Sequence, residues 1–280
     1  MIFIPVIAAF LQAGSVTLDK IILNLKKTDY KTYIGASFPM ILLINIIAFL
    51  IFKPALNAEM LSFKIISLVV ISSILSIIGN FLFYRALQHD CLSEMETISL
   101  FSNIPLIVFT SIFFISERNP MIIALALVSS LFIVWSHWNH KKFQISKLTM
   151  AFLIFILLLS PFRGIIAKHL LSVLDSISLN LFVSILPAVF FFFYYFKNME
   201  KASGRAWLLL LATNILSSIT WILYYFSYQK IGIVHTVLIF SLQPLLVYFS
   251  SIFILKEKIH WKKFLAFLIV LVCIALSQIL

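Results

Sequence analysis

One arginine inside a long apolar stretch is the residue that most needs a chemical explanation. Arg163 lies in the segment SPFRGIIAKHLL. In a helix over residues 149–171 it would sit about 4 Å from the middle, where an isolated guanidinium costs at least about 2.5–3.5 kcal/mol in a bilayer. A carboxylate or phosphate of a ligand, a carboxylate of the protein, or a reach to lipid headgroups would each compensate its charge.

Two phrases of the sequence occur twice. PLIVFTSIFFISE at 105–117 returns as PLLVYFSSIFILKE at 244–257, and FLFYRALQ at 81–88 returns as ILYYFSYQ at 222–229. A weaker echo pairs Lys20 with Lys168. These matches predict a tandem of two related halves, residues 1–140 and 147–280. Residues at matching places in the halves are therefore candidates for a shared role.

The repeat draws attention to polar and aromatic residues inside the apolar runs. Trp221 is followed by Tyr224, Tyr225 and Tyr228, and its counterpart in the first half is Asn80. An aromatic wall facing an amide would suit a small amphipathic or cationic solute, with helix packing as the alternative. The residues that we expect to line a substrate cavity are Asn80, Tyr84, Arg163, Trp221, Tyr225 and Gln243.

Glu96 and His235 each lie nine residues before a proline of the doubled phrase, Pro105 or Pro244. Glutamate and histidine are the side chains most able to exchange protons near neutral pH, so the pair is a candidate for proton coupling or gating. A structural place at helix starts is the alternative. The two prolines each remove a backbone hydrogen bond, and they predict helix breaks whose free carbonyls bend the helix or line a cavity.

The composition predicts a membrane protein. Of 280 residues, 62% are hydrophobic and 11% are charged, whereas a soluble domain is about half apolar and about a quarter charged. The net charge of +11 comes from short basic clusters between apolar runs, which indicates membrane anchors rather than a nucleic-acid surface. Cys91 and Cys273 are expected to be free thiols with no metal site, and the N-terminal run is expected to stay as the first helix.

Ten apolar runs are each about long enough to cross a bilayer as a helix. Five spans per half is an odd number, so the second half enters the membrane from the opposite side. The expected fold is an all-α polytopic membrane protein with two inverted five-helix repeats, a recurring plan of secondary transporters with a site near the midplane. The expected spans are residues 2–22, 33–52, 65–87, 96–116, 120–138, 149–171, 177–196, 206–228, 235–255 and 262–280.

This 5+5 pattern, the proline in the fourth and ninth helices and the glutamate 12 or 13 residues beyond it resemble the EamA type of the drug/metabolite transporter (DMT) superfamily. The chain departs from that type in lacking the glycines usual in the fifth and tenth helices. The resemblance implies a secondary transporter that moves a small metabolite, such as an amino acid or amine, by alternating access. It also implies a multi-pass protein of the plasma membrane, which is the inner membrane in a Gram-negative bacterium.

Other classes of function find little support in the residues. The four aspartates at 19, 29, 90 and 175 are unpaired in the sequence, and no zinc or nucleotide-binding motif is present, which argues against an intramembrane enzyme and against ATP as the energy source. A non-transporting membrane scaffold is the remaining alternative. We expect no cofactor, no metal and no nucleic acid. The expected partners are a small-molecule substrate and the lipid bilayer, with the chain as a monomer or homodimer.

Basic residues divide unevenly between the two sides of the membrane. Loops one, five, seven and nine hold 13 of them, loop three on the same side holds none, and the four loops on the other side hold four. The positive-inside rule then places both termini outside, whereas the resemblance to the DMT superfamily implies termini in the cytoplasm.

Overall fold

The apolar runs fold as helices because, in lipid, each backbone N–H and C=O must find its partner within its own segment. The computed structural model describes residues 3–25, 28–55, 57–90, 92, 95, 99, 101–137, 147–199, 203–255, 261–277 and 279. Every element in these ranges is a helix. They are α1 (Phe3–Leu23), α2 (Tyr30–Phe52), η1 (Ala58–Leu61), α3 (Phe63–His89), α5 (Asn103–Phe113), η2 (Ile115–Glu117), α6 (Pro120–His137), α7 (Lys147–Leu158), α8 (Ser160–Leu170), α9 (Ser176–Met199), α10 (Gly204–Ile231), α11 (Ile233–Phe240), α12 (Gln243–Leu255) and α13 (Trp261–Leu276).

Six segments are long and apolar enough to cross a bilayer, namely α1, α2, α3, α9, α10 and the run of α11 with α12. The bent pair α7 and α8 makes a seventh if it counts as one span, and α5, α6 and α13 supply shorter apolar helices. Large apolar side chains also cover the outside of the helices, for example Phe3, Leu50 and Phe193 at 78%, 64% and 76% exposed. A surface of this kind fits lipid, and the chain is a multi-pass helical membrane protein.

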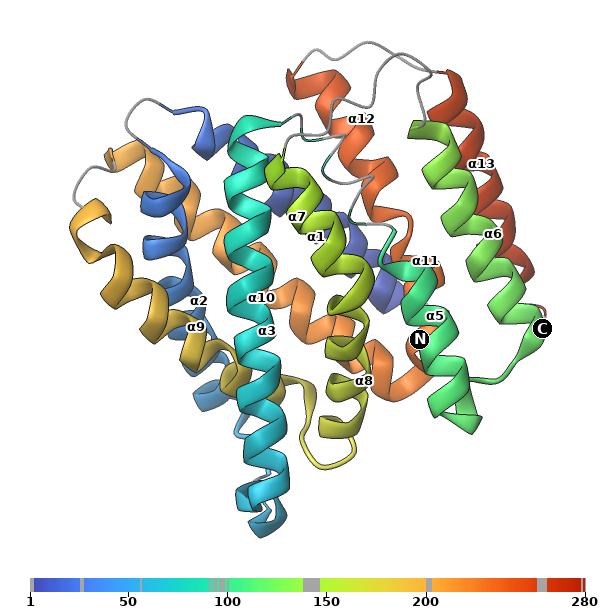
Figure 1. The fold of residues 1–280 in the computed structure, drawn as a ribbon, viewed down its shortest axis with the longest axis horizontal. Coiled ribbons are helices and arrows are strands. Elements are labelled where there is room, and N and C mark those ends of the chain that lie inside the picture. The colour runs from blue at the N-terminus through green and yellow to red at the C-terminus, as the bar shows by residue number, and fades with distance from the viewer. Residues whose placement is uncertain are drawn as a thin grey trace.

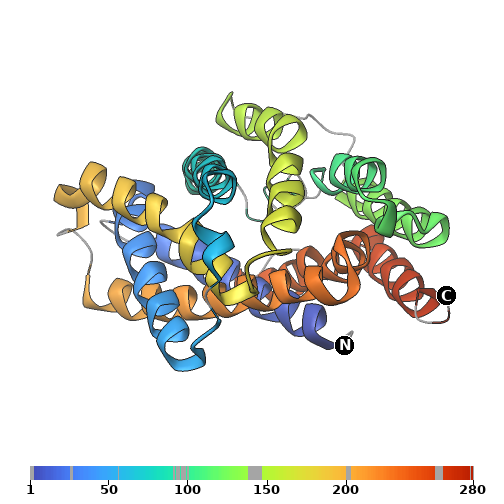
Figure 2. The ribbon, with the colours of Figure 1, turned by 90° about the horizontal axis from the view of Figure 1, so that it is seen from below.

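The helices pack in pairs across the molecule. α2 lies along α9 at one end and α6 lies along α13 at the other (Figure 1). Between these pairs, α3 packs against α7 and α8, and α1 packs against α10. Seen from below, α3, α7 and α8 lie on one side and α1 and α10 on the other (Figure 2). The cavity described below lies between these two groups.

The sixth predicted span is not the single helix expected over 149–171. α7 ends at Leu158 and α8 begins at Ser160, with a bend of 41° between them. Pro161 is at the start of α8, and a proline has no N–H to donate to the carbonyl one turn earlier. The break therefore follows from Pro161, and it sets Arg163 in the first turn of a new helix.

The fourth predicted span, expected over 96–116, is shorter in its described part. α5 ends at Phe113, and a short 3₁₀ helix follows over Ile115–Glu117. The guanidinium of Arg118 donates to the carbonyls of Ser111 and Ile112, both at 2.8 Å. A basic side chain that satisfies the last carbonyls of a helix favours its ending there.

Candidate functional site

A cavity of about 340 Å³ lies among the central helices. Its described lining comes from α1, α2, α3, α5 and from α7 to α12. All six residues predicted to line a substrate cavity do line it, namely Asn80, Tyr84, Arg163, Trp221, Tyr225 and Gln243. Its volume is at the lower end of the range for small-molecule sites, about 300–1,000 Å³.

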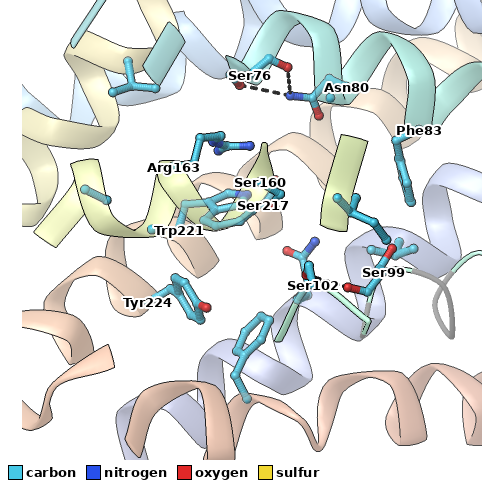
Figure 3. A pocket seen from close by; sticks show the side chains of 18 of the residues that line it. Ser76, Asn80, Phe83, Ser99, Ser102, Ser160, Arg163, Ser217, Trp221 and Tyr224 are labelled. Atoms are coloured by element: carbon cyan, nitrogen blue, oxygen red, sulfur yellow. Dashed lines mark hydrogen bonds between the residues drawn. The ribbon is translucent and has the colours of Figure 1, made fainter. Parts of the chain in front are cut away.

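Arg163 reaches the cavity from the first turn of α8 and meets an aromatic ring rather than a protein carboxylate. Its Cζ atom is 5.9 Å from the centre of the Trp221 ring, within the range of a cation–π contact. Figure 3 shows Arg163 and Trp221 turned toward the same space. The ion pair found among the described residues is that of Lys168 with Glu117. The protein carboxylate that we considered for Arg163 is therefore absent from the described part of the chain.

The close approach of α8 to α5 depends on Gly164. A Cβ atom at this position would lie 2.5 Å from Cδ1 of Leu106, closer than real contacts allow. Leu106 follows Pro105 in the first turn of α5. A side chain at position 164 would therefore displace the Leu106 side chain, which lines the cavity beside Arg163.

The aromatic residues of α10 lie together along one side of the cavity. The Trp221 ring lies 5.5 Å from Tyr224 and 5.8 Å from Tyr225, and the Tyr228 hydroxyl donates to the Tyr224 hydroxyl at 2.9 Å. All four side chains line the cavity. This wall is polar at its hydroxyls and apolar on its faces, a surface that suits an amphipathic solute.

Asn80 and Tyr84 on α3 line the cavity together with this wall. The amide nitrogen of Asn80 donates to the backbone oxygen of Ser76 at 2.8 Å and to its hydroxyl at 3.0 Å (Figure 3). Tyr84 donates to Oδ2 of Asp19 at 3.3 Å. The structure therefore links one predicted residue, Tyr84, to an acid that the prediction left out.

The prolines of the doubled phrase lie where helices restart. Pro105 is in the first turn of α5 after a turn at Phe101 and Ser102, and Pro244 is in the first turn of α12 after a turn at residues 241–242. The first turn of a helix tolerates proline because its N–H groups have no partner within the helix. Pro244 and its neighbour Gln243 line the cavity.

Asp19 on α1 is the first site residue that the sequence reasoning missed. Its side chain is 3% exposed and lines the cavity. Oδ1 accepts hydrogen bonds from the Tyr33 hydroxyl at 2.5 Å and from Oγ1 of Thr213 at 2.6 Å. The sequence could have indicated Asp19, because an aspartate inside an apolar run is a candidate functional residue. Nothing in the sequence marks Tyr33 and Thr213 as its partners.

Glu117 is the second missed residue, although it closes the doubled phrase. Its carboxylate pairs with Lys168 of α8, and it accepts from the backbone N–H groups of Ile233 at 2.9 Å and Val234 at 3.1 Å. These two N–H groups open α11, where a negative charge is favourable. Glu117 thus joins η2, α8 and α11, and we call this junction the Glu117 latch.

The predicted proton-coupling pair is only half described. Glu96 lies outside the described residues. His235 is in the first turn of α11, where its Nε2 lies 3.3 Å from the Ser277 hydroxyl, and it is not among the residues that line the cavity. The pairing of Glu96 with His235 stays a prediction.

The helices, the apolar outer surface and an internal cavity with polar and apolar lining define a multi-pass helical membrane protein with a candidate site between its helices. Residues 147–278 match the model of the EamA-like transporter family, which belongs to the DMT superfamily. This match agrees with the resemblance drawn from the doubled phrases, and it covers the second of the two predicted halves. The matched family is one of membrane transporters.

A solved structure supports the fold over nearly the whole chain. It is titled "Crystal structure of protein", has a TM-score of 0.66 and 15% sequence identity, and the likeness covers 97% of this chain and 98% of that one. At this identity the likeness shows the fold alone. No curated protein matches the chain.

Proposed function

We propose that the protein is a secondary transporter that carries a small metabolite across the plasma membrane by alternating access. The observation that carries this proposal is the cavity itself. It is lined by elements of both halves, it lies among helices long enough to span a bilayer, and it holds an arginine with no described protein anion. A charge in that position is costly unless a ligand or water compensates it, and it therefore marks a substrate path.

We further propose that the ten helices form two inverted repeats, because paired local contacts recur in the two halves. Asp29 caps α2 by accepting from the Thr32 N–H at 2.8 Å, and Asp175 at the start of α9 accepts from the Ile177 N–H at 2.8 Å. Pro39 inside α2 is matched by Pro187 inside α9. Repeats that can exchange conformations supply the two states that alternating access requires.

The Glu117 latch would serve as one of the two gates. It ties α8, which carries Arg163, to α11, which leads into Gln243 and Pro244. Releasing Lys168 from Glu117 would let these two walls of the cavity separate at that end. A gate made of one ion pair and two N–H bonds is a discrete contact that can open and close.

The test is transport by purified protein in liposomes, after a thermal-shift screen against a metabolite library has found a ligand. A ligand that binds only the folded protein raises its apparent stability by mass action. Arg163→Gln should abolish transport of an anionic solute while insertion and folding stay intact. Arg85→Gln is the matched control, because Arg85 also lies over a ring, 5.9 Å from Phe81, without lining the cavity. Unchanged transport by Arg163→Gln would favour headgroup contact as the role of this arginine.

Proton coupling and orientation need separate tests. Glu96→Gln and His235→Gln should each flatten the pH dependence of transport if they couple protons, and unchanged profiles in both variants would leave them a structural role. A C-terminal fluorescent protein that matures only in the cytoplasm tests the orientation. If both termini lie outside, as the count of basic residues predicts, the fusion gives no fluorescence. A bright fusion would favour termini in the cytoplasm, the orientation that the family resemblance implies.

A further inference from the structure

The cavity contains one acid and one base among its described lining residues, Asp19 and Arg163. Neither has an oppositely charged partner in the described part of the chain, where the ion pair present is that of Lys168 with Glu117. Among the described residues, the groups that donate to Asp19 are the hydroxyls of Tyr33, Tyr84 and Thr213. Two opposite charges therefore share one cavity without neutralising each other by direct contact.

Helix α10 gives the spacing between the two charges. Thr213 bonds to Asp19, and Trp221 lies under Arg163. These two residues are eight positions apart on one helix, which corresponds to about 12 Å along its axis at about 1.5 Å per residue. If each charged group met a ligand charge at about 3–4 Å, roughly 4–6 Å would remain between the two charges of that ligand.

Two buried polar atoms without a hydrogen-bond partner lie between the charged ends. They are Oγ of Ser218 and Oε1 of Gln12, and both residues line the cavity. Ser218 falls between Thr213 and Trp221 on α10. On α1, Ser15 bonds to Thr213 and Gly14 faces Leu216, so α1 runs antiparallel to α10. Gln12 is about one helical turn before Ser15 and therefore lies toward Trp221. Buried polar atoms are rarely left unbonded in native proteins, and a ligand that fills the gap would supply partners.

We propose that the cavity takes an elongated dipolar solute, with an ammonium group at Asp19 and a carboxylate at Arg163, separated by about two to four methylene groups. This inference rests on the proposed transport function and adds the class of substrate. An α-amino acid with an uncharged side chain is too short for both contacts, because one carbon carries both of its charges. The aromatic face of Trp221 lies at the carboxylate end of the solute, beside Arg163.

The probe is a series of unbranched ω-amino acids with one to eight methylene groups, tested on the wild-type protein. We expect both the thermal stabilisation and the uptake into liposomes to peak at about two to four methylenes. The matching alkylamine and alkanoate, each with one of the two charges, should bind at least about tenfold more weakly. A flat response along the series, or equal binding of singly charged probes, would overturn the proposal.

Variants then assign each end of the solute. Asp19→Asn should weaken binding of the best ω-amino acid at least about tenfold and leave binding of the alkanoate unchanged, and Arg163→Gln should weaken it as much and spare the alkylamine. Asp29→Asn and Arg85→Gln are matched controls outside the cavity and should bind like the wild type. If Asp19→Asn fails to fold, the wild-type length series still decides the question.

The outcomes also separate this inference from the proposed function. Transport of some other solute, with no response to the ω-amino acids, would keep the transporter and reject the dipolar substrate. Absence of transport and of thermal shift for every compound of the library would reject both.

Discussion

Two buried carboxylates lie at different places in the molecule and are held in opposite ways. Glu117 is paired with Lys168 and accepts two backbone N–H groups. Asp19 accepts only hydroxyl groups, and no described lysine or arginine pairs with it. Both side chains are almost fully buried, at 6% and 3% exposed for the whole residues.

This difference separates a carboxylate that supports the structure from one that is available to a ligand. The Glu117 latch is neutral as a group, so it needs nothing more from outside. Asp19 is well hydrogen-bonded but keeps its charge uncompensated by the described residues, and it faces a cavity. Glu117 and Asp19 are therefore both buried and hydrogen-bonded. Of the two, Asp19 is the one without an oppositely charged partner among the described residues.

The largest expected effect comes from removing the cation of the latch. Lys168→Met leaves the buried Glu117 without its partner, and breaking a buried pair in this way costs about 3–5 kcal/mol. We expect a loss at the lower end of that range, because the Lys168 side chain is 21% exposed. Thermal unfolding in detergent measures it, with Lys64→Met at an exposed lysine as the control. Equal stability of the two variants would show that the ion pair does not hold the latch.

The next effect tests the hydroxyl cage of Asp19. Tyr33→Phe removes the hydroxyl that lies 2.5 Å from Oδ1, and a hydrogen bond to a charged group contributes about 1.5–3 kcal/mol. The same unfolding assay should show this loss, while Tyr194→Phe, at a residue 68% exposed, should change little. If Tyr33→Phe is as stable as the wild type, the hydroxyls do not hold Asp19 in the way described here.

A smaller loss should come from the residue that opens α11. Gly232 has φ +84° and ψ 169°, a backbone conformation essentially limited to glycine, and forcing another residue into it costs about 1–3 kcal/mol. A Cβ atom there would lie 2.7 Å from Oε1 of Glu117, so Gly232→Ala also disturbs the latch. Gly204→Ala is the control, because nothing lies within 4 Å of its added Cβ. If the Gly232→Ala protein is as stable as the Gly204→Ala protein, the backbone conformation at Gly232 does not contribute to the stability of the latch.

The smallest effect on stability is expected at Arg163. The contact that Arg163→Gln removes is a cation–π contact with Trp221, which contributes about 0.5–1 kcal/mol at an accessible site. Unfolding should therefore change by less than about 1 kcal/mol, even where transport is lost. A large loss of stability would mean that this arginine supports the fold, as Lys168 does.

Much of the fold could be predicted because a membrane leaves few choices to an apolar chain. Runs of about 20 apolar residues had to become helices, and α2, α3, α9 and α10 follow the expected spans closely. The breaks were harder to place. Pro161 was visible in the sequence, but whether a proline bends a helix or interrupts it depends on what its neighbours pack against.

The cavity residues could be predicted where the chemistry was unusual for a bilayer. Arg163 and Trp221 stood out by type and position, and they meet in the structure. Asp19 could be seen in the sequence, but its partners Tyr33 and Thr213 lie 14 and 194 residues away. Contacts at such separation depend on how helices are arranged, and no local pattern encodes them.

The volume of the cavity has a consequence for the electrical seal of the membrane. At about 30 Å³ per molecule, a space of about 340 Å³ holds on the order of ten waters. Connected waters conduct protons, and a chain of waters from one face of the membrane to the other would dissipate the proton gradient. If the Glu117 latch closes one end of the cavity, as proposed above, it also interrupts such a chain of waters, and a variant that loosens it should make liposomes leak protons even when no solute is present.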